Sequence, residues 1–301
     1  MLSPRPSIRP GIGNPDAHGD PGMLWRRLAT GMLLAIAVGG GILTLPTAGF
    51  GVMLLVFIAV GAFEWGTLIR LSHPMAPWLY GAGVVLAIVA LWPWQALQGV
   101  WWTVMAAAAG YWFIGVPWVL WRASPAVHPR WWWWAVAGVV TLVAPWMALM
   151  ALHHHPDHGP LWVLFVMFLV WLIDTLAFFA GRCLGHSRVA PWVRPAKTLE
   201  GVTVALLGAL AFSVLGAWWL GLSRQCWPWF VVVCGVTAVF AVLGDLVESL
   251  LKRHRGVKQS GGLLPGHGGV LDRVDSLTAA APVFVMGVYM ILGDSVVEGG
   301  P

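Results

Sequence analysis

The sequence predicts an all-α, polytopic integral membrane protein. Of its 301 residues, 59% are hydrophobic and only 10% are charged, and the mean hydropathy is +0.79. One water-soluble core cannot bury so large a hydrophobic fraction. The apolar stretches repeatedly reach about 20 residues, the length that crosses a bilayer, and they are expected to be helical because lipid offers the backbone no hydrogen-bond partner.

We expect about nine transmembrane helices. Their predicted ranges are 28–45, 49–69, 76–92, 95–118, 132–152, 160–181, 201–222, 227–250 and 276–293. With a cytoplasmic N-terminus, sixteen of the seventeen lysines and arginines fall on the inner side and only Arg224 lies outside. This asymmetry predicts the N-terminus inside and the C-terminus outside. The net charge of +5 then belongs to inner loops facing anionic lipid headgroups, and no nucleic-acid partner is expected.

Three regions follow from this pattern. Residues 1–22 are rich in proline and glycine and predict a disordered cytoplasmic tail, without the features of a signal peptide. Residues 23–155 have few polar groups within their spans, among them Glu64, and are expected to form a transmembrane scaffold. Residues 156–301 are expected to form the catalytic transmembrane region. The three cysteines have no CxxC spacing, so neither a disulfide framework nor a zinc site is predicted.

A histidine-rich segment follows the fifth predicted span. Imidazole and carboxylate groups are common metal ligands. We nevertheless predict a surface loop, because proline and glycine interrupt the segment and it lies on the face opposite the other charged groups. Its members are His153, His154, His155, Asp157 and His158.

Two acidic pairs lie near the C-terminus. Asp245 and Glu248 are three residues apart on the eighth predicted span, and Lys252 shares their helix face. Asp272 and Asp275 are also three apart, just before the ninth span. Carboxylates in a membrane need a compensating positive charge, either a bound cation or nearby lysines. Because Mg²⁺ prefers a few carboxylates with water and phosphate oxygens, two converging pairs predict a magnesium site.

A glycine-rich segment, residues 261–269, connects the acidic pairs. It includes His267, Gly268 and Gly269. Glycine lets backbone amides approach an anion closely. Such a segment is commonly only a turn, but the surrounding bases favour a cradle for nucleotide phosphates. These bases are Lys252, Arg253, Arg255, Lys258 and Arg273.

A second group of polar residues lies around the sixth and seventh predicted spans. Asp174 is inside the sixth span, where an acid is either functional or paired with a base such as Arg182. Lys197 and Thr198 precede the seventh span, together with Glu200. They can bind phosphate, or Thr198 can cap the helix.

These segments together resemble a known family. Residues 249–275 are similar to the signature of phosphatidate cytidylyltransferases, also called CDP-diacylglycerol synthases, and the similarity extends over roughly residues 173–284. The matching motifs, in chain order, are DTLAFFAGR at 174–182, AKTLEG at 196–201, GDLVES at 244–249, PGHGG at 265–269 and DRVD at 272–275.

The resemblance implies transfer of CMP from CTP to phosphatidate, which gives CDP-diacylglycerol and pyrophosphate on the cytoplasmic side of a bacterial inner membrane. It implies that Asp245 and Asp272 hold Mg²⁺ with support from Glu248 and Asp275, and it allows a second, monovalent ion such as K⁺ and a homodimer. The expected catalytic residues are Asp245, Asp272, Lys258, Asp275, Arg273 and His267. The expected substrate-binding residues are Lys197, Thr198, Lys252, Arg253, Gly268, Gly269, Asp174 and Arg182.

Two positions depart from the family pattern. The family usually has aspartate where this chain has Gln259, and serine where it has Arg194. Gln259 supplies no negative charge to a metal, but both expected metal-binding aspartates remain.

Four other functions share parts of this pattern. A transporter or channel would need polar groups through the full membrane depth, and the outer half here is nearly apolar. A lipid-binding scaffold without catalysis is compatible with Gln259. A phosphotransferase that consumes a CDP-lipid would carry a DGxxAR-type motif, which the sequence lacks. A lipid or polyprenol kinase is the closest alternative, since it differs only in which nucleotide phosphorus is attacked.

Overall fold

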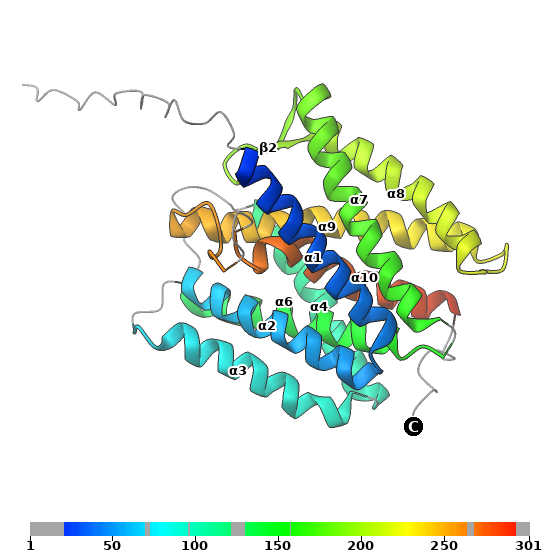
Figure 1. Cartoon of the computed structure of the whole chain (residues 1–301), viewed down its shortest axis with the longest axis horizontal. Coiled ribbons are helices and arrows are strands. Elements are labelled where there is room, and N and C mark those ends of the chain that lie inside the picture. Colours follow the sequence, from blue (N-terminus) through cyan, green and yellow to red (C-terminus); the bar gives the residue numbers. More distant parts are fainter. Residues whose placement is uncertain are drawn as a thin grey trace, which may run out of the picture.

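The computed structural model describes residues 21–69, 73–95, 97–121, 130–156, 158–263 and 268–292, and helices dominate it (Figure 1). The helices are α1 (Pro21–Thr44), α2 (Thr47–Leu68), α3 (Ala76–Leu91), η2 (Trp92–Trp94), α4 (Gln98–Gly110), η3 (Tyr111–Gly115), α5 (Val116–Trp121), α6 (Trp131–His153), α7 (Gly159–Leu184), α8 (Leu199–Trp219), α9 (Trp227–Arg255) and α10 (Leu271–Leu292). Two short strands, β1 (Arg188–Ala190) and β2 (Arg194–Thr198), lie between α7 and α8.

Seven helical segments in the described ranges are long and apolar enough to cross a membrane. They are Thr47–Leu68, Ala76–Trp94, Trp131–His153, Gly159–Leu184, Leu199–Trp219, Trp227–Arg255 and Leu271–Ile291. The other two predicted spans correspond to α1, whose Gly31–Thr44 part is a shorter apolar helix, and to the helical run of α4, η3 and α5. The helical membrane architecture is thus confirmed, whereas the count of nine and the orientation stay predictions.

The strands add a small hairpin to the predicted all-α architecture. β1 and β2 are antiparallel, with Arg188 opposite Thr198. Thr198 is the N-cap of α8, and its Oγ1 accepts a hydrogen bond from the amide of Gly201 at 3.2 Å. The Glu200 carboxylate accepts bonds from the amides of His186 and Ser187, at 3.1 and 3.0 Å. The predicted capping role of Thr198 is therefore confirmed, and the hairpin is tied to the start of α8.

His153 corrects one sequence-based prediction. It is the last residue of α6, and its side chain is buried rather than exposed in a surface loop. Its ring stacks on Phe50 with centroids 4.4 Å apart, Nδ1 contacts Oγ1 of Thr47 at 3.1 Å, and Nε2 contacts the carbonyl oxygen of Ile42 at 3.0 Å. These three partners lie more than 100 residues away in sequence, so the local pattern could not reveal them. His154 and His158 are exposed, as predicted.

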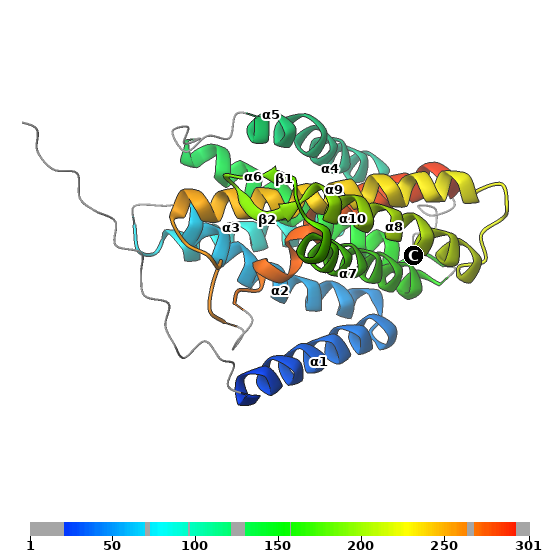
Figure 2. The same ribbon diagram turned by 90° about the horizontal axis from the view of Figure 1, so that it is seen from above.

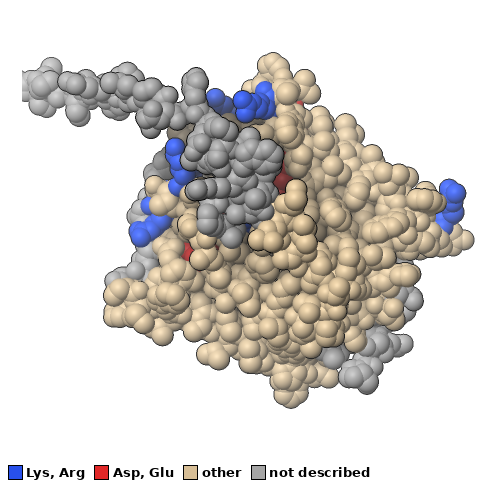
Figure 3. Space-filling model, viewed as in Figure 1, with Lys and Arg blue, Asp and Glu red and all other residues tan. Residues whose placement is uncertain are grey.

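The basic side chains gather at one end of the helix bundle (Figure 3). They surround the hairpin and the C-terminal end of α9, while an isolated basic side chain lies at the far end, in the α8–α9 loop that contains Arg224. This segregation agrees with the predicted one-sided distribution of lysine and arginine. It also means that the polar segments described below share one end of the bundle.

Close packing of α9 against α10 brings the two acidic pairs together. The helices run along each other through the core (Figures 1 and 2). A Cβ atom on Gly244 would lie 2.5 Å from the carbonyl oxygen of Asp275, so the helices can approach this closely only with glycine at that position. Asp245 is the next residue of α9, and further along the same helix Lys252 joins Glu248 to Asp272 of α10.

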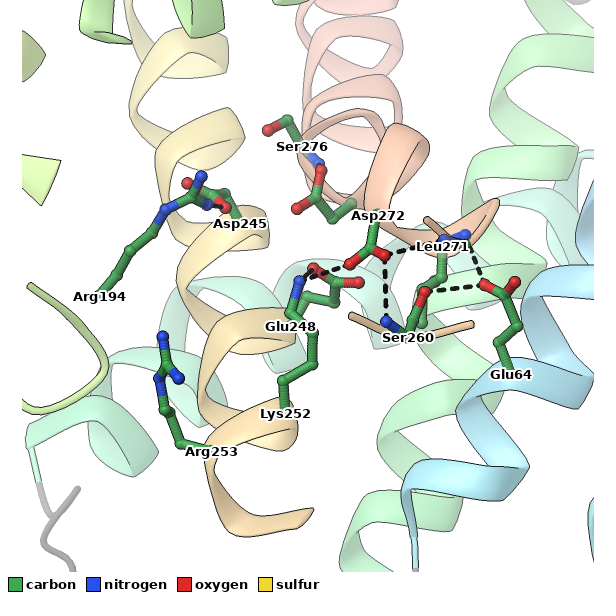
Figure 4. Close-up of polar contacts among 12 residues, drawn as sticks. Glu64, Arg194, Asp245, Glu248, Lys252, Arg253, Ser260, Leu271, Asp272 and Ser276 are labelled. Carbon is green, nitrogen blue, oxygen red and sulfur yellow. Dashed lines mark hydrogen bonds and ion pairs between the residues drawn. The ribbon is translucent and has the colours of Figure 1, made fainter. Parts of the chain in front are cut away.

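Glu64 of α2 connects the N-terminal helices to the glycine-rich segment (Figure 4). Its carboxylate is buried and accepts hydrogen bonds from Oγ of Ser260 at 2.9 Å and from the amides of Val270 and Leu271 at 3.0 and 2.8 Å. The last two amides belong to the start of α10, where helix geometry leaves amides without internal partners. One side chain thus fixes both the end of the segment and the beginning of the helix.

Two glycines make this arrangement possible. Gly268 has φ of 86°, a left-handed conformation that side chains rarely adopt. A Cβ atom on Gly269 would lie 2.5 and 2.7 Å from the two carboxylate oxygens of Glu64 and would also collide with Oγ of Ser260. The backbone can therefore reach Glu64 only if residue 269 has no side chain.

We expect Gly269→Ala to lower the free energy of unfolding by about 1–3 kcal/mol, because the added methyl group forces Glu64 and Ser260 apart. Gly262→Ala is the matched control, since a Cβ there would meet nothing within 4 Å. Both changes restrict the unfolded chain similarly. The thermal unfolding midpoints in detergent should therefore separate the two variants, and equal midpoints would contradict the packing described here.

Candidate functional site

Acidic and basic side chains converge where α9, α10 and the hairpin meet (Figure 4). Asp245 and Glu248 on α9 are only 4% and 2% exposed, although both side chains are carboxylates. Burial of carboxylates is costly unless each one is paired. The contacts around them show how the chain meets that requirement.

Asp245 is paired with two bases from β2. Nζ of Lys197 donates to Oδ2 of Asp245 at 2.6 Å and to the carbonyl oxygen of Val242 at 3.4 Å. The guanidinium of Arg194 forms an ion pair with Oδ1 of Asp245, without the directional geometry of a hydrogen bond. Arg194, which departs from the family pattern in sequence, is therefore part of this cluster.

Lys197 is itself buried, at 8% exposure. Burial, followed by the neighbouring Arg194 guanidinium, lowers the pKa of Lys197 to about 8, while Asp174 and Asp275 act to raise it. The contact with Asp245 also favours the charged form. An amine in this environment holds its proton less firmly than a lysine in water.

Lys252 bridges the two helices that carry the acidic pairs. Its Nζ donates to Oδ1 of Asp272 at 2.6 Å and also contacts Oε2 of Glu248. Oε1 of Glu248 is buried and has no hydrogen-bond partner. The predicted face shared by Glu248 and Lys252 is confirmed, and lysine is here the positive charge that balances the acids.

Asp272 also holds the glycine-rich segment. Its Oδ2 accepts hydrogen bonds from the amides of Ser260 and Gly269, both at 3.0 Å. Ser260 directly precedes the segment and Gly269 ends it, so Oδ2 of Asp272 holds the two ends of the segment together. The other carboxylate oxygen, Oδ1, contacts Lys252. Together with Glu64, Asp272 determines where the segment begins and ends.

Asp174 and Asp275 lie on the α7 side of the cluster. Oδ1 of Asp174 accepts a hydrogen bond from Oγ of Ser276 at 3.1 Å, and Oδ1 of Asp275 accepts one from the amide of Ser276 at 2.8 Å. Asp174 is close enough to Asp275 and Lys197 to interact with both electrostatically. The side chain of Arg182 is exposed, and Asp174 is paired with Ser276 rather than with Arg182.

Three other predicted bases occupy different environments. Nε of Arg253 donates to the carbonyl oxygen of Val193 at 3.2 Å, which joins α9 to the hairpin. Lys258 is exposed after the end of α9, and Arg273 is exposed on the first turn of α10. His267 lies outside the described residues.

Glu64 and Ser260 are functional candidates that local sequence patterns do not indicate. Glu64 lies in an apolar segment expected to be scaffold, yet its carboxylate contacts residues about 200 positions away. A usable signal was present, since an isolated acid inside a predicted span is a functional candidate by default. Nothing local distinguished Ser260 from any other loop serine.

The donor set was compared with the requirements of Mg²⁺. Within the part of the chain that the structure describes, no group of three or more acidic, histidine or cysteine side chains is close enough to hold a metal. Mg²⁺ is commonly held by one or two carboxylates, with waters and substrate phosphates completing the octahedron. The buried Oε1 of Glu248 has no hydrogen-bond partner and is a hard oxygen donor of the kind that Mg²⁺ prefers. In chemical type the carboxylates suit magnesium, but among the described residues Asp245 and Asp272 are paired with lysine and arginine and form no such three-residue group.

The chain is similar in sequence to bacterial proteins named phosphatidate cytidylyltransferase. The chain is 33% identical over 265 residues to a phosphatidate cytidylyltransferase of Pseudomonas aeruginosa, which covers 87% of this chain and 96% of that protein. It is 31% identical over 296 residues to one of Haemophilus influenzae, covering 90% and 100%. It is 38% identical over 137 residues to one of Staphylococcus epidermidis, covering 46% and 52%.

The cytidylyltransferase family matches residues 25–291, which include every helix from α2 to α9 and nearly all of α10. The acidic pairs, the hairpin bases and the glycine-rich segment all lie within this range. The chain therefore belongs to the cytidylyltransferase family.

Proposed function

We propose that this protein is a phosphatidate cytidylyltransferase, which transfers CMP from CTP to phosphatidate and releases pyrophosphate. The observation that carries the proposal is a cluster at one end of an apolar helix bundle, in which three bases balance three acids. The bases are Lys197, Lys252 and the half-exposed Arg194, and the acids are Asp245, Glu248 and Asp272. The names of the relatives that align over most of the chain support the same reaction.

The cluster suits a reaction between two anions. CTP and phosphatidate both carry negative phosphates, so they repel each other unless positive groups lie between them. Lys197, Arg194 and Lys252 are already held in place by carboxylates and can exchange those partners for phosphate oxygens. Groups that are positioned in advance lose little entropy when the substrate binds.

We further propose that Asp245 and Asp272 hold Mg²⁺, with Glu248 and Asp275 in support. When bound, the ion would neutralise charge on the phosphates and orient the triphosphate. In the metal-bound state Lys197 and Lys252 would turn from the carboxylates toward the substrates. A second, monovalent ion and a homodimer stay predictions.

The reaction needs no covalent intermediate with the protein. A phosphate oxygen of phosphatidate attacks the α-phosphorus of CTP, the bond from that phosphorus to the bridging oxygen of the β-phosphate breaks, and pyrophosphate departs with the electron pair. Lys197 and Arg194 would bind phosphate oxygens on the hairpin side, while Lys252 would do so between α9 and α10. Substrate binding by Gly268 and Gly269 stays a prediction, since the amide of Gly269 already donates to Asp272.

The membrane side follows from the substrates and the charge distribution. CTP is dissolved in the cytosol, and the cluster lies at the lysine- and arginine-rich end of the bundle. We therefore propose that the active site faces the cytoplasm in a bacterial inner membrane. The lipid headgroup and the nucleotide would meet at this surface.

The position of a radioactive label tests the reaction. The purified protein is incubated with Mg²⁺ and CTP labelled at the α- or the γ-phosphorus, with and without phosphatidate. Cytidylyl transfer predicts that only the α-label enters the lipid and that pyrophosphate appears only when phosphatidate is present. Entry of the γ-label would instead indicate a lipid kinase, and absence of both labels from the lipid would indicate a binding protein.

We expect Asp245→Asn and Asp272→Asn each to lower kcat on the order of 100-fold or more, because each change removes a charge that metal and phosphate contacts require. Asp157→Asn, which falls between α6 and α7 in the sequence and outside the described residues, is the control and should retain wild-type turnover. Membrane fractionation and gel filtration would establish that the variants insert and stay monodisperse. Near-normal activity in both cluster variants would remove the metal assignment.

The pH dependence of kcat/KM should report on Lys197. A lysine is charged below its pKa, so a value of about 8 predicts that phosphate binding weakens as the pH rises through this range. In Lys197→Arg the guanidinium stays charged, so the alkaline fall should move upward by at least about one pH unit. Identical profiles for the two proteins would exclude Lys197 as the titrating group.

A further inference from the structure

An apolar cavity lies beside the charged cluster, within the membrane-spanning part of the molecule. Its volume is about 240 Å³, and its walls come from α1, α2, α6, α7 and the first turns of α10. Arg273 is the one charged residue among its described walls. A smaller cavity of about 60 Å³ shares five of the same wall residues, including Leu54 and Leu277, and extends the apolar space toward α6.

The cavity is long and narrow. Along α1 its wall extends from Gly31 to Ile42, which spans about 17 Å at 1.5 Å per residue. Its volume of about 240 Å³ is distributed over this length, so the cavity is narrow. A space of this length and cross-section accepts one segment of a flexible hydrocarbon chain, whereas a compact ligand of the same volume would leave its ends empty.

The position of α1 explains why the space is present. α1 lies along the edge of the bundle beyond α2 (Figure 2), and one face of the helix is open. Met32, Leu33 and Ile36 on that face are 65%, 69% and 66% exposed, as expected for contact with lipid. The other face, with Val38 and Ile42, borders the cavity.

One end of the cavity adjoins the proposed active site. Val270, Arg273 and Val274 form that end, and Asp272 lies between them in the chain. Arg273, an exposed cation among otherwise apolar wall residues, complements a lipid whose phosphate is anionic and whose tail is hydrocarbon. This charge pattern distinguishes the cavity from a packing defect, which would have no cation at a defined end.

We propose that the cavity holds one acyl chain of phosphatidate, with the lipid phosphate at Arg273 and within reach of the cluster around Asp272. The proposal rests on the proposed function and names the part of the protein that recognises the lipid tail. α1 is then a wall of the lipid site. The second acyl chain stays in the bilayer beyond the open side of the molecule.

Filling the slot tests the proposal. We expect Val38→Trp to raise the KM for dioleoyl phosphatidate about tenfold, which corresponds to about 1.4 kcal/mol. The KM for CTP and that for dihexanoyl phosphatidate, whose short chains do not need the slot, should change less than about twofold. Ile36→Trp, on the exposed face of the same helix, is the matched control and should leave all three values unchanged.

A second pair of variants addresses the opposite wall on α7. Met167→Trp should repeat the effect of Val38→Trp, whereas Phe168→Trp, whose side chain is 47% exposed, should not. If the tryptophan variants fail to fold, wild-type protein is labelled with phosphatidate that carries a photoreactive diazirine in one acyl chain. Labelled peptides from α1, α7 and α10 are expected, and a phosphatidylcholine probe should label them much less.

Two results would overturn the proposal. One is the same ratio of long-chain to short-chain KM in all four variants as in the wild type. The other is equal labelling by the phosphatidate and phosphatidylcholine probes, which would mean that bulk lipid fills the space. Failure of the proposed function is a separate outcome, because wild-type protein would then transfer no α-label even to dihexanoyl phosphatidate.

Discussion

The pairing of buried carboxylates with lysine and arginine is the interaction on which the rest of the site depends. Asp245 and Glu248 are almost inaccessible, and in an apolar bundle neither could stay charged alone. Asp245 is therefore joined to Lys197 on β2, and Glu248 is joined to Lys252 on the same helix, α9. Lys252 also contacts Asp272 on α10. Buried ion pairs of this kind rarely increase stability over apolar packing. Their presence here is best explained by the chemistry that the charges perform.

A second layer of contacts holds these charges in position. Glu64 and Asp272 both accept hydrogen bonds from residues at or next to the ends of the glycine-rich segment. Two carboxylates from different halves of the chain therefore hold these ends together. Only glycine permits the backbone to approach them at residues 268 and 269. The segment is thus held at its base, and the start of α10 is fixed together with it. The orientation of Asp272 follows directly from this arrangement.

Much of the architecture could be predicted from the sequence because it depends on local patterns. Hydropathy alone identified the long apolar helices, and helical periodicity placed Glu248 and Lys252 on one face. Contacts between distant segments could not be predicted in this way. Ser260 and Glu64 are 196 residues apart, His153 is buried by residues of α1 and α2, and Arg194 reaches Asp245 only because the hairpin folds back. No periodicity within a segment encodes which other segment it will meet.

The contact between Glu64 and the start of α10 also limits how the two halves of the chain can evolve. The helices before α6 face lipid over much of their surface, where one apolar residue replaces another with little effect. Substitution at residue 64 would be costly, because two backbone amides and a serine hydroxyl in the other half of the chain donate hydrogen bonds to the Glu64 carboxylate. Exchange of the N-terminal helices between relatives would therefore preserve the enzyme only when the donor segment brings an acid to this depth and helix face. Residue 64 thus carries a constraint that the lipid-facing positions of the amino-terminal half do not.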